Sequence, residues 1–114
     1  HLFELCDASG ASARLFWEKV PVLDKVDNFL YAFCLPKGAN NNLAAFSHAL
    51  VEPTDAQRFI LADPQTSGGL LIAVNPNSRQ ALEGLLEEAG LYAEPIGEVI
   101  ERVDQGAGSQ IFLG

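Results

Sequence analysis

A polar loop that ends in two adjacent glycines leads directly into an apolar run, and this junction constrains the fold more than any other part of the chain. The loop reads DPQTSGG at residues 63–69, and the run reads LLIAV at residues 70–74. Asp before Pro favours a turn, and glycines permit positive φ or the close approach of another group. The run is too short for an independent helix and too apolar for an edge strand. We therefore predict a central strand covered on both faces.

The DPQTSGG loop offers hydrogen-bond donors to an anion. The candidate donors are Thr66, Ser67, Gly68 and Gly69. Successive backbone N–H groups in such a turn form a nest that holds phosphate without a large positive charge. The alternative is a tight loop that only starts a buried strand, because paired glycines before a strand are common.

The length and composition describe one ordinary globular domain. A chain of 114 residues, 48% hydrophobic and 19% charged, can bury a core without disulfides or metals and is not expected to be disordered. No apolar stretch reaches the length of about 20 residues that a membrane-spanning helix needs, and the N-terminus lacks the pattern of a signal peptide. We therefore expect a cytoplasmic protein that does not contact a membrane.

The net charge of −8, with only seven Lys and Arg residues, argues against nucleic acid as a partner. An anionic ligand must therefore be held by backbone dipoles, metal ions or basic residues from another part of the protein. Cys6 and Cys34 form no CxxC pair, and the two histidines complete no zinc motif. Both thiols are expected to be buried and reduced, and His48 to be structural or exposed.

Hydrophobic periodicity gives the order of elements. We predict a helix ending before Gly10, a strand near residues 13–17, an amphipathic core helix at 22–33, a polar loop at 36–42, a helix within 43–50, a connector at 52–57, a helix at 81–89 ending at Gly90, and a closing hairpin of 96–103 and 110–113. Helices that alternate with strands indicate an α/β (α+β) fold with a mixed β-sheet covered by helices.

Several of these segments together resemble selenophosphate synthase, also called selenide, water dikinase. The similar segments are residues 1–10, 35–38, 42–46, 63–74 and 96–99. The resemblance covers essentially the whole chain and implies a three-layer sandwich like the C-terminal domain of the aminoimidazole ribonucleotide synthetase superfamily. The chain also begins without Met, inside a helical pattern that has no capping residue ahead of it. We therefore expect residues 1–114 to be a single C-terminal domain cut from a longer enzyme, with the N-terminal domain absent.

The resemblance implies an ATP-dependent phosphotransferase that converts selenide, ATP and water into selenophosphate, AMP and phosphate, with Mg²⁺. Selenophosphate would serve selenocysteine and selenouridine synthesis. The family's catalytic Cys or selenocysteine, its Lys, its glycine-rich loop and its main metal-binding aspartates belong to the N-terminal half, so no catalytic residue and no bound cofactor are expected in this chain alone. The implied partners are the protein's own N-terminal domain and, in the full-length enzyme, a second copy in a homodimer.

In the family the DPQTSGG loop lies near the junction of the two domains, where it would form one wall of the nucleotide site. Asp63 and Gln65 are then expected to hold the loop by side-chain hydrogen bonds. Asp63 is also a candidate metal ligand, although Asp before Pro is often structural. Packing between domains, without ligand contact, is the alternative role for the whole loop.

One segment departs from the family pattern. Where bacterial relatives usually have Pro-Gly-Gly-Thr followed by Arg-Asn, this chain has PKGANNN at residues 36–42. Lys37 replaces a glycine, and Asn41 occupies the position of the arginine. A neutral amide cannot replace a bidentate guanidinium, but Lys37 could compensate as a point charge. Lys37 and Asn42 are therefore candidate anion contacts, and a solvated surface turn is the alternative.

Two other functions stay open at this point. One is the C-terminal domain of a different ATP-dependent synthetase or kinase of the same superfamily, which the wording of the DPQTSGG loop disfavours. The other is an interaction module without chemistry of its own. An upstream Cys or selenocysteine followed closely by Lys, a glycine-rich segment and several Asp would favour selenophosphate synthase over both.

Overall fold

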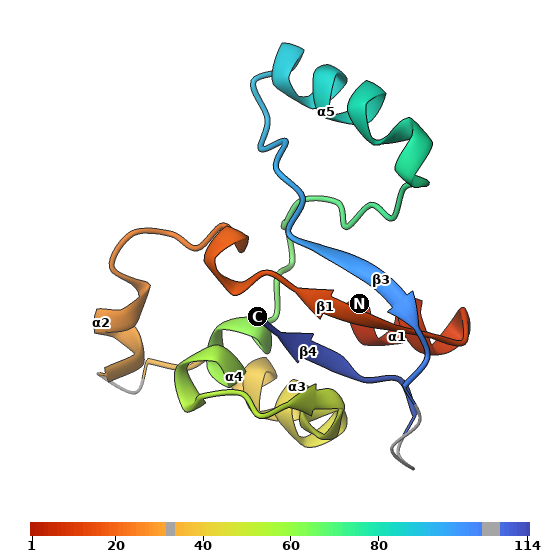
Figure 1. Cartoon of the computed structure of the whole chain (residues 1–114). Helices are drawn as coiled ribbons and strands as arrows, with labels where there is room; N and C mark the ends of the chain where they lie inside the picture. The colour runs from red at the N-terminus through yellow and green to blue at the C-terminus, as the bar shows by residue number, and fades with distance from the viewer. Residues whose placement is uncertain (32–33, 104–107) are drawn as a thin grey trace.

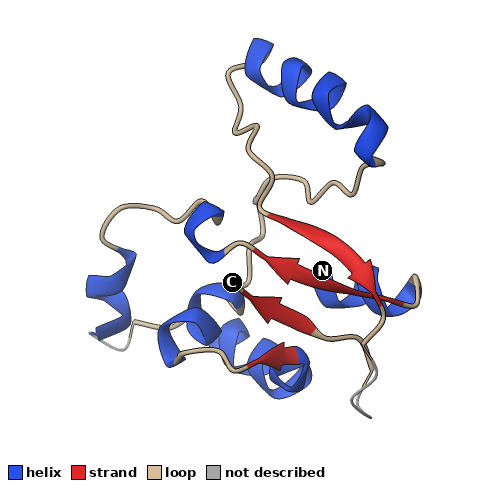
Figure 2. Cartoon of the chain, viewed as in Figure 1, coloured by secondary structure: helices blue, strands red, loops and turns tan. Residues whose placement is uncertain are grey.

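The computed structural model describes residues 1–31, 34–103 and 108–114. A four-stranded sheet with the order β2-β4-β1-β3 forms its centre (Figure 1, Figure 2). The strands are β1 Ala11–Leu15, β2 Leu50–Val51, β3 Gly97–Glu101 and β4 Ile111–Leu113. β1 runs antiparallel to β3 and parallel to β4, and β2 runs parallel to β4. The mixed sheet with helices that the sequence predicted is confirmed.

The helices are α1 Leu2–Ala8, α2 Val26–Tyr31, α3 Lys37–Phe46, α4 Asp55–Leu61 and α5 Arg79–Glu88, with short 3₁₀ turns η1 Trp17–Lys19, η2 Ser47–Ala49 and η3 Pro76–Ser78. Gly10 and Gly90 follow α1 and α5 with φ of 62° and 67°, as expected of glycines that end helices. α4 begins in the predicted connector because Thr54 and Gln57 form a reciprocal capping box.

The buried core lies around β1 and consists mostly of small side chains. Its apolar members are Cys6, Ala13, Leu15, Ala39, Ala49, Ala62 and Ile111. The prediction that both cysteines are buried is therefore right for Cys6 and wrong for Cys34, which is exposed. None of the described residues of helix α5 is buried, so the stripe at 81–89 forms a helix but not a core.

The helix predicted at 22–33 is shorter than expected and does not line the core. α2 begins only at Val26, because Lys25 has φ of 68°, a left-handed conformation that a helix cannot continue through. Leu23 is 84% exposed and Phe29 59% exposed. Phe33, the last predicted position, lies outside the described residues.

The predicted polar loop at 36–42 is helical instead. α3 starts at Lys37 directly after Pro36, whose ψ of 144° keeps it outside the helix. The asparagine run has weak intrinsic helix propensity, but Ala39 is fully buried, and such packing overrides propensity.

The strand predicted at 70–74 does not form. Leu70, Leu71, Ile72 and Val74 are all exposed, Leu70 by 90%, and the backbone of residues 66–74 makes no hydrogen bond within the described chain. The central strand β1 already has β3 and β4 as neighbours, so it offers no free edge. Residues 70–96, including α5, extend away from the sheet as an arm (Figure 1).

The predicted closing hairpin is also wrong in its pairing. Both strands exist, but β1 lies between β3 and β4, so they do not pair with each other. Instead, the buried Ser12 hydroxyl accepts the N–H of Val103 at 3.0 Å and that of Gln110 at 3.2 Å. This hydroxyl joins the end of β3 to the start of β4.

In the part of the chain that the structure describes, no helix has the length and apolar character needed to cross a bilayer.

Candidate functional site

The DPQTSGG loop lines one wall of a wide cleft of about 980 Å³. Six of its seven residues line the cleft: Asp63, Pro64, Gln65, Thr66, Gly68 and Gly69. Other parts of the lining come from α1, α2, α3, α4 and the segment between β1 and α2, and they include Val22, Leu23 and Phe29. These three side chains are exposed, so much of the cleft wall is apolar and open to solvent. The sequence pattern predicted that these residues form the buried stripe of a core helix, whereas the structure places them in the lining of the cleft.

The loop is closed on itself by a side-chain hydrogen bond and leaves its backbone donors open. The Gln65 amide donates to the Asp63 carboxylate. The backbone N–H groups of residues 65–69 donate to no other described group, and residues 64–69 are exposed. Several neighbouring N–H donors are therefore available to a ligand at the edge of the cleft.

The two glycines of the loop do not have the positive φ that the sequence suggested. Positive-φ glycines in the described chain are Gly10, Gly90 and Gly108. At Gly68 a Cβ would lie 3.0 Å from the Cβ of Gln65, within the same loop, so the close approach of a ligand or another domain stays a prediction. At Gly69 a Cβ would meet nothing within 4 Å. A side chain at Gly68 would therefore make a tight contact within the loop, whereas Gly69 has open space beside it.

The second candidate segment, the start of α3, lies against the base of the DPQTSGG loop. Asn42 donates its side-chain amide to the carbonyl of Ala62 at 2.9 Å. A Cβ on Gly38 would lie 2.8 Å from Cγ of Pro64, so only glycine fits without a shift. Sequence reasoning chose Asn42 as an anion contact and did not single out Gly38. Lys37 is exposed at the first position of α3 and is not among the residues that line the cleft.

The described residues do not assemble a metal site. Among residues 1–31, 34–103 and 108–114, no three His, Cys, Asp or Glu side chains are placed to hold one ion. The carboxylate of Asp63, the candidate ligand, already accepts the Gln65 amide. The donors of residues 1–31, 34–103 and 108–114 therefore do not fit a self-contained Mg²⁺ site.

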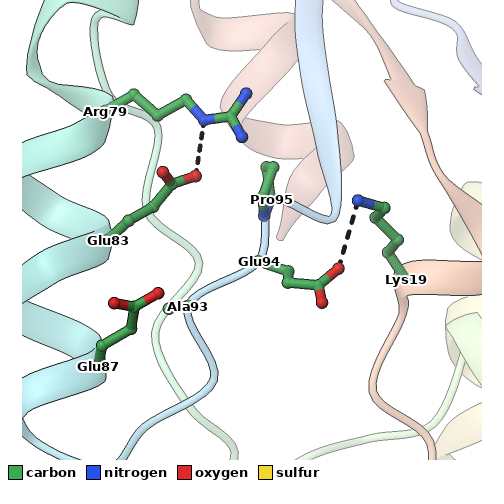
Figure 3. A pocket seen from close by; sticks show the side chains of 7 residues that line it. All are labelled: Lys19, Arg79, Glu83, Glu87, Ala93, Glu94 and Pro95. Carbon is green, nitrogen blue, oxygen red and sulfur yellow. Dashed lines mark hydrogen bonds and ion pairs between the residues drawn. The ribbon is translucent and has the colours of Figure 1, made fainter.

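A smaller hollow of about 330 Å³ lies between α5 and the segment leading into β3 (Figure 3). Four of its charged side chains form ion pairs, Lys19 with Glu94 at 3.3 Å and Arg79 with Glu83 at 2.6 Å, and Glu87 also lines it. The Tyr92 hydroxyl also donates to the carbonyl of Lys19 at 2.7 Å. The contacts of Lys19 with Glu94 and Tyr92 fasten the arm to η1, whereas the pair of Arg79 and Glu83 lies within α5.

The two cysteines differ in environment. Burial raises the pKa of the Cys6 thiol, which disfavours the reactive thiolate. Neither cysteine was predicted to be a nucleophile, and Cys6 has the properties of a small core residue. His48 is exposed and packs edge-on against Phe3, with ring centroids 5.4 Å apart.

The family described as AIR synthase related protein, C-terminal domain, matches residues 1–108. The chain belongs to this family. The matched residues of this AIR synthase related domain include α3, the DPQTSGG loop and the arm.

Relatives of this AIR synthase related domain are named selenide, water dikinase. One from Sulfurovum sp. (strain NBC37-1) is 46% identical over 98 residues, which is 86% of this chain and 29% of the relative. One from Aeromonas hydrophila is 44% identical over 102 residues (90% and 30%), and one from Colwellia psychrerythraea 41% over 100 residues (88% and 29%). The resemblance inferred from the sequence is confirmed, and the chain spans about three tenths of the length of these relatives.

Proposed function

We propose that this chain is the C-terminal domain of an enzyme that makes selenophosphate from selenide, ATP and water, releasing AMP and phosphate. Its DPQTSGG loop forms one wall of a nucleotide site between this domain and an N-terminal domain. The observation that carries the proposal is the set of exposed backbone N–H groups at residues 65–69, which have no partner in the described chain and lie at the edge of a cleft. Such donors suit the phosphates of ATP in a chain with net charge −8.

The proposed role of the N-terminal domain is to cover the cleft and supply the reacting groups. The apolar side chains of Val22, Leu23 and Phe29 face solvent, and an interface would remove them from water. In this proposal the nucleophile, the Lys and the Mg²⁺ ligands belong to that domain, as the family resemblance implies. The described residues of this chain hold no group of three His, Cys, Asp or Glu side chains placed for one ion; of its cysteines, Cys6 is buried and Cys34 is exposed. We further propose that the full-length enzyme is a cytoplasmic homodimer.

Selenide-dependent AMP formation from ATP tests the proposal. The full-length enzyme should form AMP and a new selenium-bonded phosphorus signal in ³¹P NMR only when selenide and ATP are both present. The separate chain of residues 1–114 should form neither. AMP formation by residues 1–114 alone would show that the chemistry lies within this chain. A full-length protein that consumes ATP with other acceptors but not selenide would favour another synthetase of the superfamily.

A further inference from the structure

We infer that Gly38 and Asn42 are positioning residues that fix the DPQTSGG loop on helix α3. The two residues are one helical turn apart and therefore lie on the same face of α3. Each contacts the segment that enters the loop, Gly38 at Pro64 and Asn42 at Ala62. This inference rests on the proposed function, in which the position of the loop affects ATP binding.

The contact at Asn42 satisfies a carbonyl at the end of a helix. Ala62 is the C-terminal cap of α4 and is 9% exposed, and its carbonyl belongs to the group that a helix leaves without an internal partner. The Asn42 amide donates to that carbonyl at 2.9 Å in a partly buried setting. Asn42 thus uses one of its two amide N–H donors at the base of the loop, one residue before Asp63, and acts through the position of the loop.

The contact at Gly38 is steric. A Cβ at this position would lie 2.8 Å from Cγ and 3.0 Å from Cβ of Pro64, distances that real Cβ atoms rarely or never show. The proline ring is stiff, so Pro64 cannot yield by rotating a side chain, and the backbone of the loop would have to move. Gly84 in α5 provides the matched contrast, because a Cβ there would meet nothing within 4 Å.

The first experiment is a double-mutant cycle in the full-length enzyme that pairs Gly38→Ala with Pro64→Ala. Gly38→Ala should raise the Michaelis constant for ATP by about tenfold or more, with a smaller change in kcat and none in the Michaelis constant for selenide. Pro64→Ala removes the closest atom, so Gly38→Ala should have only a small effect on ATP in that background. The thermal unfolding midpoint should show the same non-additivity, and the Gly84→Ala control should raise the midpoint slightly without changing ATP kinetics.

A second pair of variants tests Asn42. Asn42→Asp keeps the size of the side chain but removes the donor, and Asn40→Asp adds the same charge at an exposed position of α3. The Asn42 variant should raise the Michaelis constant for ATP, and the Asn40 variant should leave it unchanged. Equal effects of the two Asp variants would overturn the role of Asn42.

The outcomes separate this inference from the proposed function. Additive unfolding effects of Gly38→Ala and Pro64→Ala, or a Gly38→Ala enzyme that behaves like Gly84→Ala, would overturn the positioning role. Non-additive unfolding with unchanged ATP kinetics in every variant would support the contact and contradict the use of the loop for ATP.

Discussion

Gln65 donates its side-chain amide to the carboxylate of Asp63, two residues earlier in the same loop. This bond bridges Pro64 and closes the turn from which the exposed N–H groups of residues 65–69 project. It also engages the carboxylate that the sequence offered as a candidate metal ligand. This contact supports the expectation that Asp63 and Gln65 hold the loop by side-chain hydrogen bonds, and the metal-ligand role of Asp63 stays the alternative.

The first prediction separates loop shape from metal binding at Asp63. In the full-length enzyme Asp63→Asn keeps an oxygen acceptor for Gln65 and should stay close to wild type in both ATP kinetics and Mg²⁺ dependence. Asp63→Ala removes the acceptor and should cost about tenfold in kcat/KM for ATP, the value of one lost charge-assisted hydrogen bond. A large rise in the Mg²⁺ concentration that half-activates Asp63→Asn would show that Asp63 is a metal ligand after all.

The second prediction concerns Lys37, whose effects on binding and stability should have opposite signs. A cation at the first position of α3 faces the positive end of the helix dipole, so Lys37→Ala should be neutral or stabilise the domain by about 0.3–1 kcal/mol. If Lys37 attracts the phosphates of ATP, the same variant should raise the Michaelis constant for ATP, and adding Asn41→Arg should restore part of the loss. Thermal melts and steady-state kinetics measure the two effects separately. Unchanged ATP kinetics would make Lys37 an ordinary surface residue.

The third prediction concerns the buried Ser12 hydroxyl, which accepts the N–H groups of Val103 and Gln110. Ser12→Ala leaves two donors without this partner and should lower the free energy of unfolding by about 2 kcal/mol. Ser9→Ala, at an exposed position after α1, is the control and should change stability by no more than about 0.5 kcal/mol. Denaturant unfolding of both variants measures the difference, and equal midpoints would contradict the role of this hydroxyl.

The fourth prediction follows from the raised pKa of the Cys6 thiol, which burial causes. The folded state favours the neutral thiol, so burial of Cys6 contributes fully to the free energy of unfolding below the ordinary thiol pKa of about 8.5. This contribution is lost as the pH rises through the higher pKa of the folded state. Thiol labelling at pH 7 with peptide mapping should modify exposed Cys34 well before Cys6. Rapid labelling of Cys6 in the folded protein would contradict its burial.

Short-range sequence signals predicted several elements well. α1 and α5 end before Gly10 and Gly90 because glycine tolerates the left-handed conformation that stops a helix, and that requirement is local. β3 and β4 were recognised from their apolar patterns, although their pairing was wrong. Pairing depends on β1, which lies far away in sequence and between them in space.

The remaining differences between the predicted and observed elements depend on long-range contacts. The 36–42 segment is helical because Ala39 is buried and Gly38 and Asn42 contact the DPQTSGG loop, and none of these contacts has a local signal. The run at 70–74 has the composition of a buried strand, but its backbone pairs with neither edge strand of the sheet, β2 or β3. For the candidate site, the sequence proposed the loop, Lys37 and Asn42 as candidates, but the contact of Gly38 with Pro64 could be seen only in the structure.

The most direct test of the account is the ATP kinetics of full-length Gly68→Val. A side chain at Gly68 would press on Cβ of Gln65 at 3.0 Å and cover the exposed N–H groups beside the cleft. We predict selenide-dependent AMP formation by the wild-type enzyme and a loss of kcat/KM for ATP of at least about tenfold in the variant, with a nearly unchanged unfolding midpoint. A variant that unfolds earlier but keeps the wild-type kcat/KM would show that the DPQTSGG loop is purely structural and would contradict the account.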